Sequence, residues 1–271
     1  MNADLIYHTF PPPPHLAAHI RSFWVLEGRL AGMPYTHRTM ADGCAEMVFH
    51  YKGPFKEVTA SGKMEDSFLS GYHGQTDRFR RFTIDTHFGI FGVYLYPFAL
   101  PDLFNIPAAS ISNQMVGLVE LFGQEGRDVE EQVMLADSQQ QRISIICRLF
   151  EKRLTKTSQS RPGVFNAIAH IIHTRGLVRI DELAQKHFLS RRQFERKFRE
   201  FSGFSPKLFA RIIRFQQAMQ QYGNKEISLT QIAYECGYYD QSHFIHDFKE
   251  FSGHHPKQFF LHSAEGAPVW E

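Results

Sequence analysis

The chain has 271 residues, of which 43% are hydrophobic and 21% are charged, with a formal net charge of +2. This composition excludes an intrinsically disordered chain. No apolar run reaches the roughly 18 residues of a membrane span, and no basic start precedes an apolar export segment. The three cysteines are far apart and form no CxxC pair, which indicates a reducing setting. We therefore expect a cytoplasmic protein without a membrane partner.

The N-terminal part has the composition of β-strands. Four segments rich in aromatic and β-branched residues are separated by Gly, Pro and Asp clusters, and they span 22–29, 46–52, 67–73 and 88–97. Short strands at this spacing predict a small sandwich or barrel.

From about Leu100 the hydrophobic pattern changes to a helical period, in segments 99–107, 113–123 and 127–155. The last segment carries an apolar stripe at steps of three and four residues, formed by Ile143, Ile146, Cys147, Phe150 and Leu154. We expect this stripe to pack on the chain's own β domain; the alternative is a homodimer contact. The polar segment that follows, closed by Pro-Gly, is typical of a linker.

These patterns predict an α+β protein of two domains. Residues 1–156 would form a mainly β domain followed by helices, for effector binding or dimerisation, and 157–163 a linker. Residues 164–271 would form an all-α domain. Its helices are predicted at 164–175, 180–187, 190–201, 206–222, 228–236, 240–251 and 256–262.

A short phrase occurs twice in the helical part, as EFSGFSP at 200–206 and EFSGHHP at 250–256. At this offset of 50 a longer set of positions repeats: Phe194, Phe198, Phe201, Gly203, Pro206 and Phe209 align with Phe244, Phe248, Phe251, Gly253, Pro256 and Phe259. Each copy has the outline of a helix-turn-helix, at about 180–201 and about 228–251, and the 206–222 helix joins them. The glycine would end each second helix and the proline would begin the next.

The second helix of the first copy is strongly basic. The segment Lys186–Arg214 contains nine basic residues and two acidic ones. On a helical wheel Arg192, Arg196 and Arg199 lie opposite the repeated phenylalanines, which should be buried. Exposed arginines on this helix suit the guanine edges and phosphates of double-stranded DNA. The alternative is a solvated, charged helix face.

The helical part resembles the arabinose-regulator (AraC/XylS) family of bacterial transcription factors over residues 165–262. The signature is carried by SLTQIAYECGYYDQSHFIHDFKEFSGHHPKQF at 228–259, with Tyr238 and Tyr239 as departures from the family pattern. The resemblance implies two recognition helices that enter successive major grooves of DNA. It also implies a sequence-specific transcription regulator that contacts RNA polymerase and is not an enzyme.

The resemblance carries a set of DNA-contacting residues over by position. The base readers would be Arg192, Glu195 and Arg196 in the first unit and Gln241, Ser242 and His246 in the second. The other contacts implied are Ser190, Arg191, Arg199, Lys207, Asp240 and Lys249. The acidic Glu195 would accept a hydrogen bond from a cytosine amino group, or else pair with Arg191 or Arg199.

The two copies differ in charge. Ser242, His246 and Lys249 of the second copy align with the three arginines of the first, and residues 235–262 have a net charge of −2 with neutral histidine. We therefore expect the first unit to supply most of the electrostatic affinity for DNA. Histidines predicted to be exposed in the second unit would gain charge and tighten binding as the pH falls: His243, His246, His254 and His255.

The N-terminal half resembles cupin-like sensor domains of the same family, in FWVLEG (23–28), ADGCAEMVFHY (41–51) and GVYLYPFALPDLFNIP (92–107). The resemblance implies control by a small-molecule effector. Aromatic residues that would line a pocket, or equally a core, are Phe23, Trp24, Tyr51, Phe91 and Tyr94. We expect Cys44 to be a small buried residue, with redox sensing as the alternative.

No catalytic constellation is recognisable in the sequence. The chain has no GxxxxGK[ST] phosphate loop, no GxSxG elbow and no HExxH or HxH pair. We therefore expect no catalytic residue, no metal and no cofactor. Two rivals stay open: a ligand- or partner-binding protein with non-specific nucleic-acid binding, and a cupin-type metalloenzyme fused to a DNA-binding domain.

Overall fold

The computed structural model describes residues 4–59, 61–155, 163–221 and 227–260. The strands are β1 (Asp4–Phe10), β2 (Ile20–Arg29), β3 (Tyr35–Thr39), β4 (Ala45–Lys52), β5 (Lys56–Val58), β6 (Met64–Asp66), β7 (Ser70–His73), β8 (Arg80–Ile84), β9 (Phe88–Leu95) and β10 (Met115–Gly117). The helices of the N-terminal region, residues 4–155, are α1 (Ala99–Phe104), the 3₁₀ turn η1 (Ala108–Ser110), α2 (Leu118–Phe122), α3 (Gln124–Leu135) and α4 (Gln139–Leu154). The helical region, residues 163–260, contains α5 (Gly163–His173), α6 (Ile180–Lys186), α7 (Arg191–Ser202), α8 (Pro206–Met219), α9 (Leu229–Glu235), α10 (Gln241–Ser252) and α11 (Pro256–Phe260).

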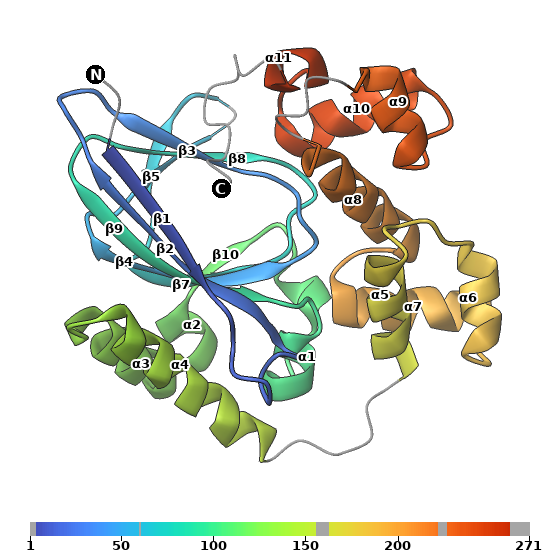
Figure 1. Cartoon of the computed structure of the whole chain (residues 1–271). Helices are drawn as coiled ribbons and strands as arrows, with labels where there is room; N and C mark the ends of the chain where they lie inside the picture. The colour runs from blue at the N-terminus through green and yellow to red at the C-terminus, as the bar shows by residue number, and fades with distance from the viewer. Residues whose placement is uncertain (1–3, 60, 156–162, 222–226, 261–271) are drawn as a thin grey trace.

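Two antiparallel sheets enclose a common interior in the N-terminal region (Figure 1). The larger has the order β1-β2-β9-β4-β7-β10, and the smaller has the order β3-β8-β5-β6. Side chains alternate along β2, so that Trp24 and Leu26 lie in the core between the sheets while Phe23 and Val25 lie in the core on the outer side. Gly92 on β9 gives the Trp24 ring its space, because a Cβ atom there would lie 2.0 Å from the indole.

The outer face of the larger sheet is covered by α1 to α4 (Figure 1). The apolar stripe predicted on the last of these helices is buried in that contact: Ile143, Ile146, Cys147 and Phe150 belong to the same core cluster as Phe23 and Phe91. Leu154 packs against its edge. The stripe therefore packs on the chain's own β-structure, as expected, and it is not exposed as a surface for a second copy.

The strand prediction was incomplete. It located β2, β4, β7 and β9, but it missed β1, β3, β5, β6, β8 and β10. Residues Met64–Asp66 are fully exposed and residues Tyr35–Thr39 are half-buried, so these strands have little of the apolar content that the prediction used. The 113–123 segment was predicted to be helical, but Met115–Gly117 pairs with β7 before α2 begins. The 127–155 segment contains two helices, and Ser138 caps the second by accepting a hydrogen bond from the Gln141 amide.

The helical region follows the prediction closely, because local signals agree there. Ser190 and Gln193 form a capping box at the start of α7, and Ser205, Ser228 and Asp240 cap the next three helices in the same way with their side-chain oxygens. Gly203 and Gly253 have φ angles of +82° and +73°, in the left-handed region that ends a helix most easily with glycine. The repeated sequence therefore marks the C-terminal ends of α7 and α10, which have the same backbone geometry.

The linker predicted at 157–163 lies outside the described residues except for Gly163, which begins α5. The division of the chain at this segment stays a prediction. Within the described residues, no helix combines the length and the hydropathy that a membrane span requires.

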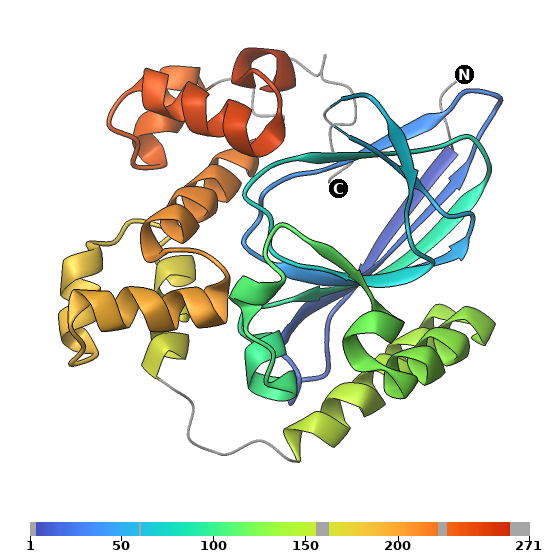
Figure 2. The same ribbon diagram turned by 180° about the vertical axis from the view of Figure 1, so that it is seen from behind.

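The two regions share a core. Helix α8 runs along the side of the β-structure, with the α9–α10 pair beyond one of its ends and the α6–α7 pair near the other (Figure 2). Ala41 and Phe98 from the N-terminal region are buried in the same cluster as the phenylalanines of the helical region, and the Phe98 and Phe165 rings have centroids 4.5 Å apart. The β-structure therefore contacts the element that joins the two helix-turn-helix units.

Candidate DNA-binding surface and adjoining cavity

Helices α6 and α7 form the first helix-turn-helix unit. Phe194 and Phe198 of α7 are buried against Ala184 of α6, whereas Phe201 is half-buried and packs against Phe165. The opposite side of α7 is exposed and carries Arg192, Arg196 and Arg199. None of these three arginines has an ion-pair partner among the described residues. Their guanidinium groups are available to a polyanion.

Glu195 is partly neutralised within the first unit. Its Oε1 atom accepts a hydrogen bond of 3.1 Å from Arg191 Nε, and Arg191 also lies 3.1 Å from Asp181 of α6. The pairing of Glu195 with Arg191 is one of the two alternatives that the sequence left open. All three side chains are largely exposed, so this network contributes little to stability.

Helices α9 and α10 form the second unit, with Ala233 buried in the place of Ala184. Ser242 and Lys249 are exposed on α10, while Gln241 is half-buried and accepts a hydrogen bond of 3.0 Å from the Thr230 hydroxyl. Asp240 caps α10 by accepting from the amide of His243, and these interactions lower the pKa of the Asp240 carboxyl. The remaining predicted contacts outside α10, Ser190 and Lys207, are exposed at the first turns of α7 and α8.

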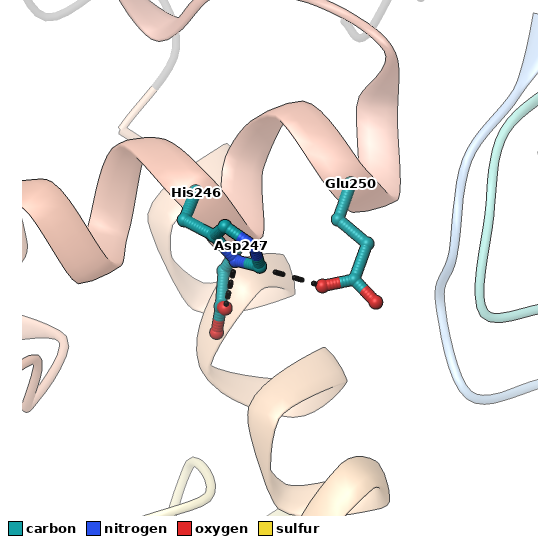
Figure 3. A group of neighbouring side chains, drawn as sticks. All are labelled: His246, Asp247 and Glu250. Carbon is teal, nitrogen blue, oxygen red and sulfur yellow. Dashed lines mark ion pairs between the residues drawn. The ribbon is translucent and has the colours of Figure 1, made fainter.

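One face of α10 is occupied by an ion-pair network (Figure 3). Arg211 of α8 donates to both Asp247 oxygens, at 2.6 and 3.2 Å, and to Glu250 at 2.6 Å. His246 Nδ1 lies 3.5 Å from Asp247 and 3.7 Å from Glu250. His246, Asp247 and Glu250 lie close enough to ligate a cation. Because the Arg211 guanidinium already occupies both carboxylates, the cluster is better suited to an ion pair than to a metal.

The network changes two charge arguments made from the sequence. Arg211 counts toward the basic excess of Lys186–Arg214, but its charge is balanced by α10, so the available positive charge belongs mainly to α7. The prediction that four histidines of the second unit are exposed was also wrong, because His254 is only 8% exposed and His255 is half-buried. His243 and His246 are the exposed pair, and each lies beside a carboxylate.

The N-terminal region contacts the C-terminal end of both recognition helices. The Ser112 hydroxyl donates to the Gly203 carbonyl of the first unit at 3.1 Å. In the second unit, the Ala41 amide donates to the Phe251 carbonyl at 3.1 Å, and Arg38 Nη1 donates to the Ser252 carbonyl at 3.3 Å. The repeated glycines also make these contacts close, since a Cβ atom at Gly203 would lie 2.3 Å from Ser112 Oγ.

A cavity of about 250 Å³ lies between the sheets and α8. Trp24 and Tyr94 line it from the larger sheet, and Gln216 and Met219 line it from α8. Of the aromatic residues proposed for a pocket, Trp24 and Tyr94 are therefore correct. Phe23 and Phe91 lie in the core on the outer face instead, and Tyr51 donates its hydroxyl to Glu27 away from the cavity.

The cavity also contains charged groups that the sequence analysis did not single out: Arg21, Asp42 and Glu46. Asp42 and Glu46 are half-buried residues that line the cavity. Burial raises the pKa of both carboxyls, that of Glu46 to about 8. Burial also raises the pKa of the Cys44 thiol to about 12, so this cysteine is a poor candidate for a reactive thiolate. The available signal was the acidic residue Glu46 directly before the apolar run Met47–Phe49 of β4.

Two family models match the chain. Residues 183–261 match a model described as a helix-turn-helix domain, and residues 8–117 match one described as a domain of unknown function (DUF6597). The first match covers both recognition helices, and the second covers the strands that surround the cavity.

Two curated relatives are named as regulators. The chain is 22% identical over 154 residues to the Msm operon regulatory protein of Streptococcus mutans, which is 56% of this chain and 55% of that protein. It is 32% identical over 72 residues to the HTH-type transcriptional activator RhaS of Escherichia coli, which is 27% of this chain and 26% of that protein. The chain thus spans about half the length of the first relative and about a quarter of the second.

The chain is also similar to solved structures. ToxT from Vibrio cholerae O395 has a TM-score of 0.47 and 13% identity, over 88% of this chain and 95% of that chain. The DNA-binding domain of AdpA, in complex with a target DNA, has a TM-score of 0.35 and 23% identity, over 38% of this chain and 92% of that chain. On the repeat, the matched helix-turn-helix model and the named relatives, residues 183–261 form a helix-turn-helix domain of the AraC type.

Proposed function

We propose that the protein is a sequence-specific DNA-binding regulator of bacterial transcription, which inserts α7 and α10 into successive major grooves. The observation that carries this proposal is the pair of helix-turn-helix units joined by one continuous helix, α8. A rigid connection fixes the separation of two recognition helices, as a dimer interface does in other helix-turn-helix proteins. The exposed arginines of α7 supply the charge that DNA binding requires.

The contacts with DNA follow from these positions. We propose that Arg192, Arg196 and Glu195 reach base edges from α7, and that Gln241, Ser242 and His246 do so from α10. Phosphate contacts would come from Ser190, Arg191, Arg199, Lys207 and Lys249, with Asp240 fixing the start of α10. Arginine binds guanine through two parallel hydrogen bonds, so Arg192 and Arg196 would contribute most to base recognition.

The N-terminal region would control this activity through the segment 38–44. Arg38, Asp42 and Cys44 line the cavity, while Ala41 between them donates to the end of α10 and accepts a hydrogen bond from Gln216 of α8. A small-molecule effector in the cavity would therefore contact the same segment that positions the second recognition helix. Binding shifts DNA affinity only if the effector prefers one arrangement of that segment.

The partners of such a regulator are double-stranded DNA and RNA polymerase, and its place of action is the cytoplasm. The printed name of one relative, a transcriptional activator, supports the polymerase contact. A homodimer also belongs to this proposal, although the apolar stripe on α4 is not its interface because the chain's own sheet covers that stripe.

Selection of sequences from a random duplex library by the full-length protein tests the proposal. We expect a bipartite consensus with two half-sites about 10 base pairs apart, bound at least roughly 10³-fold more tightly than random DNA. Binding that does not depend on sequence would favour the non-specific rival. A stoichiometric metal in the purified protein would favour the metalloenzyme rival.

A further inference from the structure

Among the described residues that line the cavity, no cationic side chain is paired with Glu46. Arg80 lies 3.3 Å from Glu57, and Arg38 donates to the Ser252 carbonyl and stacks on Phe79 at 4.8 Å, so both arginines have other partners. Arg21, which also lines the cavity, interacts electrostatically with Asp42 and donates to Cys44 at 3.5 Å.

Two further cavity groups supply no positive charge at neutral pH. Burial lowers the pKa of His37 to about 4 and that of His73 to about 3, so both are neutral near pH 7. Glu46 is therefore a half-buried carboxyl without a cationic partner among the described residues that line the cavity.

Aromatic side chains surround this carboxyl. Trp24 donates its indole N–H to Glu46 Oε1 at 3.2 Å, and the Tyr94 hydroxyl is hydrogen-bonded to the same side chain. Tyr7 lies within electrostatic range of Glu46, and its ring centroid is 6.3 Å from that of Trp24. A carboxylate beside Trp and Tyr side chains suits organic cations, because such a site offers both negative charge and aromatic rings for cation–π attraction.

We propose that the cavity binds a small organic cation with a flat or apolar body, such as an amine, amidine or guanidine, with its charged group between Glu46, Trp24 and Tyr94. An organic anion is disfavoured, since it would lie beside Glu46 and Asp42 and would have to compete for Arg21. The inference rests on the proposed function, because it names the class of effector that would act through the segment 38–44. The ligand touches Asp42 and Cys44 on one side and Gln216 and Met219 of α8 on the other.

Three probes of the same shape and different charge test the proposal: benzamidine, benzamide and benzoate, which are cationic, neutral and anionic at pH 7. Each is titrated into the full-length protein without DNA and followed by isothermal titration calorimetry. We expect benzamidine to bind at least tenfold more tightly than the other two. Equal or tighter binding of benzamide or benzoate, or no binding of any probe in the millimolar range, overturns the proposal.

The variant Glu46→Gln keeps the shape of the side chain and removes its charge. It should weaken benzamidine at least tenfold without changing benzamide. Glu65→Gln on the exposed strand β6 is the matched control and should bind benzamidine like the unmodified protein. An unchanged benzamidine affinity in Glu46→Gln overturns the proposal. The selectivity of the unmodified protein does not depend on whether this variant folds.

Proton release gives a second readout. With a pKa of about 8, Glu46 is mostly protonated in the empty cavity at pH 7, and a bound cation would displace that proton. Titrations in two buffers of different ionisation enthalpy should report close to one proton released, and none for Glu46→Gln. Besides Arg38, Arg80, His37 and His73, the titratable groups that line the cavity with Glu46 are Tyr7, Arg21, Tyr35, Asp42, Cys44 and Tyr94. Absence of release with unchanged benzamidine binding contradicts the assignment to Glu46.

These titrations separate the two proposals. Selective binding of benzamidine without a DNA consensus would support the cation site and contradict the proposed function as a regulator. A DNA consensus without selective binding of benzamidine would support the proposed function and contradict the cation site. If both hold, benzamidine should change the affinity for the selected DNA at least twofold in the unmodified protein and leave it unchanged in Glu46→Gln.

Discussion

The two recognition helices begin and end in the same way, but the side chains on their outer faces differ in charge. α7 and α10 have equal lengths, side-chain caps at their starts and left-handed glycines at their ends. The outer face of α7 carries arginines without ion-pair partners among the described residues, whereas Asp247 and Glu250 of α10 bind Arg211 of α8. The positions that recur in both copies are the buried phenylalanines and the glycine that ends the helix, because packing requires them. The exposed positions have no such requirement, and they differ between the two helices.

The largest expected effect is on stability, at the second unit. Arg211→Ala removes the partner of Asp247, whose side chain is only 10% exposed, and should lower the free energy of unfolding by about 2–4 kcal/mol. Chemical denaturation of the full-length protein measures it. Arg192→Ala, on the exposed face of α7, is the control and should change stability by less than about 0.5 kcal/mol. Similar changes in the free energy of unfolding for both variants would contradict the view that Arg211 stabilises the fold and Arg192 does not.

The next effect is on DNA affinity, at the first unit. Arg196→Ala should weaken binding to the selected site by about 1–3 kcal/mol, because a bidentate contact to guanine is lost. His246→Ala should cost less than about 0.5 kcal/mol, since His246 already lies beside Asp247 and Glu250. Titrations at one fixed salt concentration compare the two variants. Equal losses of DNA affinity in the two variants would show that both units contribute equally to binding.

A smaller effect tests the shared helix ends. Gly203→Ala and Gly253→Ala should each destabilise by about 1–2 kcal/mol, because both sites require a left-handed backbone. The added methyl at Gly203 would also meet Ser112 Oγ. The Gly203→Ala penalty should therefore be smaller in a Ser112→Ala background, as a double-mutant cycle in thermal unfolding would show. No coupling would argue against the contact between Ser112 and the C-terminal end of α7.

The smallest expected effect is a pH dependence of the second unit. His243 and His246 are the two histidines exposed on α10, and the hypothesis from the sequence is that DNA binding tightens by less than about tenfold between about pH 7.5 and pH 6. The carboxylates of Asp240, Asp247 and Glu250 lie beside these histidines and would keep the effect small. The double variant His243→Gln/His246→Gln should bind with an affinity that is flat over this range. If the double variant binds DNA with the same pH dependence as the unmodified protein, other residues than His243 and His246 cause that dependence.

The helical region was predictable because its signals are local. A capping serine or aspartate, a phenylalanine face at steps of three and four, and a glycine at the end define α7 and α10 within a dozen residues each. The N-terminal strands were less predictable. The strand β9 is apolar throughout and was found, whereas β3 and β6 are short and polar and depend on pairing with distant partners.

Much of the candidate site could not be read from residue spacing. Arg211 belongs to a basic segment in the sequence, and only the packing of α8 against α10 brings it to Asp247 and Glu250. His254 follows a helix-ending glycine and was expected to be exposed, but the fold buries it beside Phe259. Glu195 had two alternative roles in the sequence: it lies 3.1 Å from Arg191 in the structure, and its contact with a base stays a prediction.

The sequence by itself determined the repeated helix-turn-helix frame, the basic face of α7 and the family of the C-terminal domain, because each depends on residues close together in the chain. The tertiary structure alone decided how the segment 38–44 reaches both the cavity and α10, and which charges in the cavity balance one another. Those relations join strands, loops and helices that are far apart in sequence. Their energies depend on burial and distance, which no local pattern of residue types contains.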